Sequence, residues 1–330
     1  MSAPVSTCRG PVSPADIGPT LIHEHIFVRN PELELNLPDG EWDEASAIDR
    51  AVAGLEALHG LGIRTVVDLT VPGLGRDLRA VAAVARRTRV NIVVSTGWYS
   101  PNVLPTYFAF HRPGGLIDGP DPLEGLFVRD ITEGIAGTGI RAGMLKVMTE
   151  AEGMTPDVSR VLTAAAAAQR VTGIPITTHS NPALRNGLQQ QAFLGERGVP
   201  PERLVIGHSG DGADLAYLRE LMDNGSTLGM DRFGMRHVLD DETRLRTVLS
   251  LLELGYADRM VLSHDAAFYS HVTTPSWRAQ TAPDWHMEHI SRRILPALRQ
   301  AGVAEAEIEQ MMVRNPARLL EPDLNTEETS

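Results

Sequence analysis

Four histidines and one aspartate could form a metal site in this chain, because each stands near the end of a short apolar segment. They are His23, His25, His179, His208 and Asp265. Imidazole nitrogens and carboxylate oxygens are common protein ligands of zinc and similar divalent ions. His23 and His25 are two residues apart, so on a strand they point to one face and can converge on one ion, while Glu24 points to the other face. A lone histidine is more often a hydrogen-bonded core residue, but five such side chains favour a metal site.

Five ligands are too many for a single tetrahedral ion that keeps one position open for water. Two ions about 4 Å apart fit better, and such a pair needs a bridging anion. Lys146, in the apolar segment 142–148, is a candidate: a charged lysine is costly to bury, whereas a neutral amine can add CO2 and become a carbamate. The alternative is a lysine whose amine extends to solvent, with Glu150 as the bridging carboxylate. The residues alone leave both possibilities open.

The elements that would position these residues repeat as strand and helix. Short segments rich in β-branched residues alternate with longer segments of helical period. The predicted strands span residues 20–25, 65–70, 91–97, 142–148, 175–180, 203–209, 226–232 and 259–265. The predicted helices span residues 43–60, 76–88, 122–137, 156–172, 187–198, 213–224, 241–255 and 284–301. This repetition predicts an α/β fold, a closed (β/α)8 TIM barrel, whose enzymes form their sites at the C-terminal ends of the strands. An open doubly wound sheet is the alternative, but no glycine-rich phosphate loop follows the first predicted strand.

The composition narrows the class of protein. With 30 Lys+Arg against 42 Asp+Glu, the formal net charge is −12, which disfavours a nucleic-acid partner. Cys8 is the only cysteine, and the first residues lack the charged and apolar run of a signal peptide, so we expect a cytoplasmic protein. No stretch reaches the roughly 18 apolar residues of a membrane helix. We expect a single domain over residues 1–330, with its core over about 15–320 and a polar tail at 325–330.

Six sequence motifs connect the chain to a known family: GPTLIHEHIFV, LKVM, ITTHSN, IGHSGD, GMDRFG and LSHDA, in that order. They resemble the phosphotriesterase family of the amidohydrolase superfamily, most closely its phosphotriesterase-like lactonase branch. The resemblance implies two divalent metal ions, with zinc expected and cobalt, manganese or iron as alternatives, and it implies a homodimer. It implies that both ions are bridged by carboxylated Lys146 and a hydroxide. The implied ligands are His23, His25 and Asp265 for the more buried ion, and His179 and His208 for the more exposed ion.

Two positions bear on the substrate. Tyr99 matches the tyrosine that lactonases of the family place beside the metals, where organophosphate specialists have tryptophan, and Arg232 matches the lactonase arginine where those specialists have histidine. Trp98 precedes Tyr99, so a shift of one residue in this loop would place Trp98, in place of Tyr99, beside the metals. The structural alternatives are an aromatic shelf for Tyr99 and an ion pair of Arg232 with Asp211. We expect a small-molecule hydrolase that opens acyl-homoserine lactones or γ- and δ-lactones and hydrolyses organophosphate triesters more weakly. A dedicated phosphotriesterase is the first alternative, and an amidase of the same family is the second.

The expected mechanism is attack of the metal-bridging hydroxide on the lactone carbonyl. Asp265 would receive the proton and return it to the leaving alkoxide, while Tyr99 would orient the ester. Asp211 resembles the carboxylate that relays this proton onward in the family.

Other residues are expected to lie outside the chemistry. His264 should face the helix layer, because its neighbour Asp265 faces the metals. His286 and His289 are expected to be solvated histidines on a helix. The loop 266–283 matches the family's substrate lid in position, and its aromatic and apolar residues should bury an acyl chain.

Overall fold

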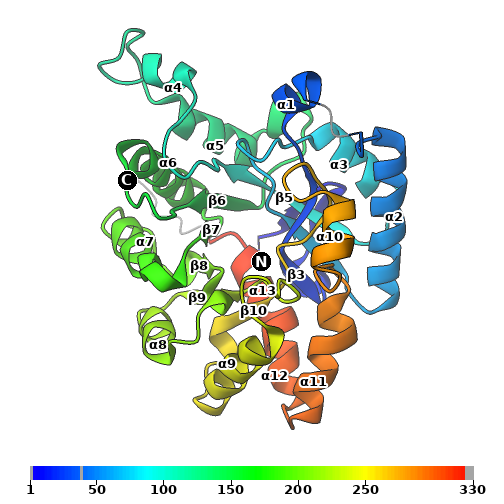
Figure 1. Cartoon of the computed structure of the whole chain (residues 1–330). Helices are drawn as coiled ribbons and strands as arrows, with labels where there is room; N and C mark the ends of the chain where they lie inside the picture. The colour runs from blue at the N-terminus through cyan, green and yellow to red at the C-terminus, as the bar shows by residue number, and fades with distance from the viewer. Residues whose placement is uncertain (1–2, 38–39, 324–330) are drawn as a thin grey trace.

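The computed structural model describes residues 3–37 and 40–323. At its centre is a curled sheet of parallel strands with helices outside it, so the predicted (β/α)8 barrel is confirmed (Figure 1). Along the sheet the order is β10-β9-β8-β7-β6-β5-β4-β3-β11. The strands are β3 (Thr20–Val28), β4 (Thr65–Asp68), β5 (Asn91–Gly97), β6 (Met144–Met148), β7 (Ile176–His179), β8 (Leu204–Gly207), β9 (Thr227–Met230), β10 (Met260–Leu262) and β11 (Ala267–Ser270). Each predicted strand overlaps one of β3 to β10. The predicted tail at 325–330 lies outside the described residues.

Six of the eight helices that cover the barrel begin after a residue whose side chain caps them. Asp43, Asp77, Asp214 and Asp240 each accept a hydrogen bond from the backbone N–H three residues later, which satisfies one of the free donors at a helix start. The helices that cover the barrel are α2 (Glu44–Gly60), α3 (Leu78–Ala85), α5 (Pro122–Thr132), α6 (Pro156–Thr172), α7 (Asn186–Gly195), α8 (Leu215–Asp223), α9 (Asp241–Glu253) and α11 (Leu295–Gln300). None of the described helices is long and apolar enough to span a bilayer.

Several short elements lie between or beyond these strands and helices. They are β1 (Val5–Thr7), β2 (Gly10–Val12), α1 (Pro31–Asn36), α4 (Thr106–Phe110), α10 (Pro275–Thr281), α12 (Glu305–Glu309) and α13 (Asn315–Leu320). Short 3₁₀ turns lie at Pro14–Asp16, Ile135–Gly137, Pro182–Leu184, Pro201–Arg203, Ser209–Asp211 and Ala257–Arg259, and π-helical turns at Ile290–Ile294 and Gln310–Arg314. The predicted helix over 284–301 is therefore wrong at its start, because the chain forms turns before the π-helical segment that leads into α11.

The eighth position of the barrel is shared by two short strands. β10 pairs with β9, and β11 pairs with β3, so the intervening residues 263–266 form the seam that closes the barrel. At this seam the backbone N–H of Asp265 donates to the carbonyl of His23 at 3.0 Å, and that of His25 donates to Ala266 at 2.8 Å. The middle of β3 is therefore tied directly to the segment that carries Asp265.

A fully buried carboxylate fixes this seam. Glu24 is 0% exposed and accepts hydrogen bonds from the Ser263 hydroxyl at 2.7 Å, from the backbone N–H groups of His264 and Ala266 at 3.0 Å each, and from His264 Nδ1 at 2.6 Å. The Nε2 atom of His264 accepts from the N–H of Ile290, so its proton is on Nδ1 and faces Glu24. His264 thus faces outward, as predicted, and joins the seam to the helix layer.

Replacing Glu24 with alanine should strongly destabilise the barrel, because the buried donors at the seam would lose their acceptor. We expect the free energy of unfolding to fall by about 3 kcal/mol or more. Denaturant unfolding of metal-free protein measures it, with Glu253→Ala, an exposed position at the end of α9, as the control. Equal losses for both variants would show that the seam does not depend on this carboxylate.

Candidate functional site

The predicted metal ligands meet in one cavity at the C-terminal ends of the strands. Its volume is about 360 Å³, and His23, His25, Lys146, His179, His208 and Asp265 all line it. The Oδ1 atom of Asp265 lies 3.0 Å from His25 Nε2 and 3.2 Å from His23 Nε2. On the other side, His208 Nε2 lies 2.9 Å from His179 Nδ1. Nitrogen and oxygen atoms that could bind a metal therefore converge on one small volume from strands that are distant in sequence.

Local irregularities in the backbone direct these side chains inward. The register of β3 on β4 shifts between Leu21 and Glu24, so Ile22 packs in the interior cluster and the next residue, His23, also faces the interior. Such a bulge redirects side chains beside functional sites. His208 and Asp265 have positive φ angles of 61° and 54°, a backbone conformation that is strained for residues with side chains. The alternation of a regular strand therefore does not by itself produce this site.

Asp231, at the end of β9, orients two of the histidines, and the sequence analysis missed it. Its carboxylate lies 2.7 Å from His23 Nδ1 and 3.0 Å from His208 Nδ1, and it accepts from the backbone N–H of His208 at 2.8 Å. Although burial opposes its charge, the two histidines hold the pKa of Asp231 below its ordinary value. The Nδ1 protons face Asp231, so the Nε2 lone pairs point into the cavity, as metal ligands require. Its place beside Arg232 at a strand end was the signal that could have identified it.

Lys146 is the only lysine in the chain; every other basic side chain apart from histidine is arginine. It is 1% exposed, and its Nζ atom lies 3.4 Å from His23 Nε2. Burial lowers its pKa to about 8, against the opposing effect of Asp265 and Asp231. Of the ordinary basic side chains, lysine is the one that burial can neutralise, whereas arginine stays charged. The amine therefore faces the ligands and does not extend to solvent.

Glu150, the alternative bridging group, lies outside the ring of ligand atoms. Its carboxylate accepts from the Asn181 amide at 2.7 Å and lies 3.8 Å from Nε2 of His179. That nitrogen is on the opposite side of the ring from Nδ1, which faces His208. The geometry therefore favours Lys146 over Glu150 as the source of a bridge.

The residues present fit divalent cations. Burial lowers the pKa of His179 to about 4 and that of His208 well below its ordinary value, so both rings stay neutral and keep lone pairs for a metal. The ligand atoms of His23, His25 and Asp265 lie within 4.8 Å of one another, and so do those of His23, His208 and Asp231. In the second group the short contacts are Nδ1 hydrogen bonds to Asp231. The first group is therefore the better candidate for holding an ion directly.

Tyr99 and Arg232 also line the cavity. Tyr99 packs edge-on against the ring of His179, with centroids 5.6 Å apart, and burial raises its pKa to about 12. Trp98 instead packs on Phe108, so the alternative that exchanges Trp98 and Tyr99 is wrong. Tyr99 therefore lines the cavity beside the histidines, and Trp285 is a second aromatic residue of the lining.

Arg232 lines the cavity and also forms ion pairs with two aspartates. Its Nε donates to Asp265 Oδ2 at 2.9 Å, and its Nη1 donates to Asp211 Oδ2 at 2.8 Å. Burial opposes its charge, but Asp265 and Asp211 raise its pKa. Asp211 is not among the residues that line the cavity, so it reaches the site through this guanidinium.

The loop 266–283 contributes to the cavity with different residues from those expected. Ala267, Ser270, Val272 and Thr273 line it, but the predicted aromatic lining is wrong. Phe268 packs against α2, where a side chain at Gly54 would collide with its ring. Tyr269 is fully buried against Trp42. Both rings therefore contact residues of, or just before, α2 and do not line the cavity.

One of the two histidines before α11 is not solvated. His289 is buried, and its Nε2 lies 2.6 Å from Asp241 Oδ2, whereas His286 is exposed in the preceding turn. The expectation of two solvated helix histidines is therefore wrong for His289.

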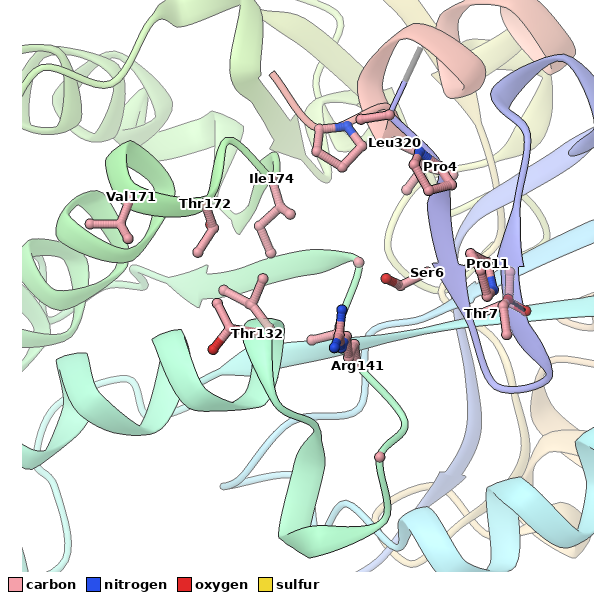
Figure 2. Close-up of a pocket in the computed structure, with 17 residues that line it drawn as sticks. Pro4, Ser6, Thr7, Pro11, Thr132, Arg141, Val171, Thr172, Ile174 and Leu320 are labelled. Carbon is pink, nitrogen blue, oxygen red and sulfur yellow. Dashed lines mark hydrogen bonds between the residues drawn. The ribbon is translucent and has the colours of Figure 1, made fainter. Parts of the chain in front are cut away.

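A larger cavity, of about 680 Å³, lies among the hairpin of β1 and β2, the ends of α5 and α6, and Leu320 (Figure 2). Among the described residues of its lining, Arg141 is the only charged one. It lacks the convergent titratable side chains of the smaller cavity, so size does not identify the functional site here.

Comparison with known proteins agrees with this geometry. A model described as "Phosphotriesterase family" matches residues 3–320. The structure described as "Structure of the phosphotriesterase from Mycobacterium tuberculosis" is 46% identical, with a TM-score of 0.94 over 97% of this chain and 98% of that one. An "Aryldialkylphosphatase" of Saccharolobus solfataricus is 37% identical over 92% of this chain and 95% of its own length. Another structure, with 37% identity and a TM-score of 0.87 over 97% of this chain and 100% of that chain, is described as "Molecular Engineering of Organophosphate Hydrolysis Activity from a Weak Promiscuous Lactonase Template".

Replacing Asp231 with asparagine should weaken metal binding, because the amide cannot accept from both Nδ1 atoms and its NH2 group favours the opposite histidine tautomer. We expect metal affinity to fall roughly 10- to 100-fold. Competition with a chelator measures the change, and Asp258→Asn, at an exposed aspartate, is the control. Unchanged affinity in the Asp231 variant would mean that other contacts set the tautomers.

Proposed function

This chain belongs to the phosphotriesterase family of hydrolases, and from that premise we propose that it is a two-metal hydrolase that prefers lactones and acts more weakly on organophosphate triesters. The observation that carries the preference is the pairing of Tyr99 and Arg232 on the wall of the cavity that contains Asp265. Both residues match the lactonase branch. The likeness to a structure whose description mentions a lactonase template supports the same assignment.

The ligand atoms divide into two sets. His23, His25 and Asp265 would hold one ion, and His179 and His208 would hold the other. The amine of Lys146, carboxylated by CO2, would bridge them and supply the negative charge that two adjacent cations need. When bound, two divalent ions of this kind supply a hydroxide nucleophile near neutral pH and polarise the substrate carbonyl.

The side chains around the ligands would hold and move the proton. Asp265 would accept the proton released on attack and return it to the alkoxide that leaves as the ring opens. Arg232 donates to Asp265 Oδ2 and so fixes the orientation of that carboxylate. Tyr99 keeps its proton at neutral pH, because burial raises its pKa to about 12. It can therefore donate a hydrogen bond to the lactone.

We assign Asp211 a holding role, in place of the relay that the family resemblance implies. Arg232 stands between Asp265 and Asp211, and a guanidinium is a donor with no acceptor site. A proton on Asp265 therefore has no path through Arg232 to Asp211.

A dedicated phosphotriesterase is the second candidate. It would use the same ligands, and the relative named as an aryldialkylphosphatase favours it. The two functions differ in the transition state. A lactone carbonyl becomes tetrahedral on attack, whereas a triester is already tetrahedral and carries three bulky substituents into a five-coordinate state.

Lys146→Ala should reduce metal content below about two ions per chain, and a short carboxylic acid such as propionate should restore part of it by occupying the bridge. Because the chain has a single lysine, protein labelled only at lysine gives one side-chain NMR signal. That signal should couple to carbon from labelled CO2 once metal is added. A variant that keeps both ions and full rate without propionate, or a lysine signal that never couples to CO2, would contradict the carbamate.

A substrate panel tests the preference itself. On one metal-defined sample, kcat/KM for the best of the acyl-homoserine, γ- and δ-lactones should exceed that for paraoxon by at least about two orders of magnitude, or roughly 2.7 kcal/mol of differential transition-state binding. Tyr99→Trp should narrow this ratio mainly by lowering the lactone rate, because it removes the donor and adds an apolar wall. Trp98→Phe, outside the cavity, is the control. Equal or greater efficiency on paraoxon would assign the chain to the organophosphate hydrolases.

A further inference from the structure

A row of alternating charges runs from the cavity into the helix layer. Asp265 accepts from Arg232, Arg232 donates to Asp211 Oδ2 at 2.8 Å, and the other oxygen of Asp211, Oδ1, accepts from Arg244 Nη2 at 2.6 Å. Asp211 is thus held between two guanidinium groups, one on each oxygen. The row continues outward, because Arg244 lies 3.7 Å from Asp241.

Arg244 is buried far more completely than its place on the outer helix α9 would suggest. It is 1% exposed, and its Nη1 donates to the backbone carbonyls of Met235 and Leu239. These carbonyls belong to the segment that connects β9 to α9. Burying an unpaired guanidinium is costly, so the partners on both Nη atoms account for its presence here.

Arg244 and Arg232 have different relations to the cavity. Arg232 lines it and touches Asp265. Arg244 does not line it and meets the lining through Asp211, which holds Arg232, and through the backbone carbonyl of Met235. Without Arg244, Oδ1 of Asp211 would lose its guanidinium partner and the carboxylate could turn. The long side chain of Arg232 would then lose one of the two contacts that fix its guanidinium.

We propose that Arg244 is a positioning residue for the reaction: by holding Oδ1 of Asp211, it directs Oδ2 to Arg232 and keeps the Arg232 guanidinium against Asp265. This inference rests on the proposed hydrolase function, but it does not depend on whether lactones or triesters are preferred. A merely structural Arg244 would stabilise the fold without coupling to Arg232.

A double-mutant cycle tests the coupling on holoenzyme with measured metal content. Arg244→Met should lower kcat about tenfold with a smaller change in KM, and Arg232→Met should lower it at least as much. In the Arg232→Met background, Arg244→Met should have little further effect, because the residue it acts through is gone. Arg244→Lys should recover part of the rate by restoring a cation beside Asp211. Arg246→Met, at an exposed arginine on the same helix, is the matched control.

Spectroscopy of cobalt-substituted protein gives a readout separate from activity. Asp265 would be a metal ligand, so loss of the Arg232 hydrogen bond should shift the visible absorption of bound Co²⁺. The shift in Arg244→Met should resemble that in Arg232→Met, and Arg246→Met should show none. If Arg244→Met does not fold, Asp211→Asn, which keeps the shape of the side chain, should give the same shift.

Running the cycle on both a lactone and paraoxon distinguishes a failure of the proposed substrate preference from a failure of the proposed role of Arg244. A preference for paraoxon with the coupling intact would overturn the proposed substrate and leave the role of Arg244 standing. Additive effects on kcat with both substrates, together with an unchanged cobalt spectrum, would overturn the role of Arg244.

Discussion

The whole site depends on the buried carboxylate of Glu24, which holds the two ends of the barrel together. It accepts hydrogen bonds from Ser263, His264 and Ala266, and these residues surround Asp265 on the chain. A residue with a positive φ angle relaxes unless its neighbours fix it, and here the neighbours on both sides of Asp265 are fixed by one acceptor. The position of Asp265 against His23 and His25 follows from this closure.

Inside the closed barrel, burial favours the uncharged form of three candidate ligands. It favours neutral rings for His179 and His208 and a neutral amine for Lys146, because a low-dielectric interior disfavours unpaired charge. Asp231 sets the tautomer of two other rings, because its carboxylate accepts from Nδ1 of His23 and of His208 and so places their protons on that nitrogen. These hydrogen bonds leave the Nε2 lone pairs of His23 and His208 free to bind cations.

The charges around the ligands show why lysine and arginine are not exchangeable here. Apart from its histidines, the chain uses arginine at every basic position except Lys146. At Arg232 and Arg244 the guanidinium geometry matters, because each joins partners on different elements through separate nitrogens. At position 146 an arginine could not become neutral or form a carbamate. Each position therefore requires its own basic side chain, lysine at 146 and arginine at 232 and 244.

The sequence by itself determined the barrel and the convergence of its candidate ligands. Hydrophobic period and chain order define the strand ends, and parallel strands bring those ends to one side of the barrel. Only the tertiary structure decided which side chains meet across strands. It pairs Asp231 with two histidines and keeps Glu150 outside the ring of candidate ligand atoms. It also places Ile22 in the interior beside His23 and turns Tyr269 away from the cavity. Local spacing contains no information on such contacts, since they depend on strand register and on backbone angles that only the closed barrel imposes.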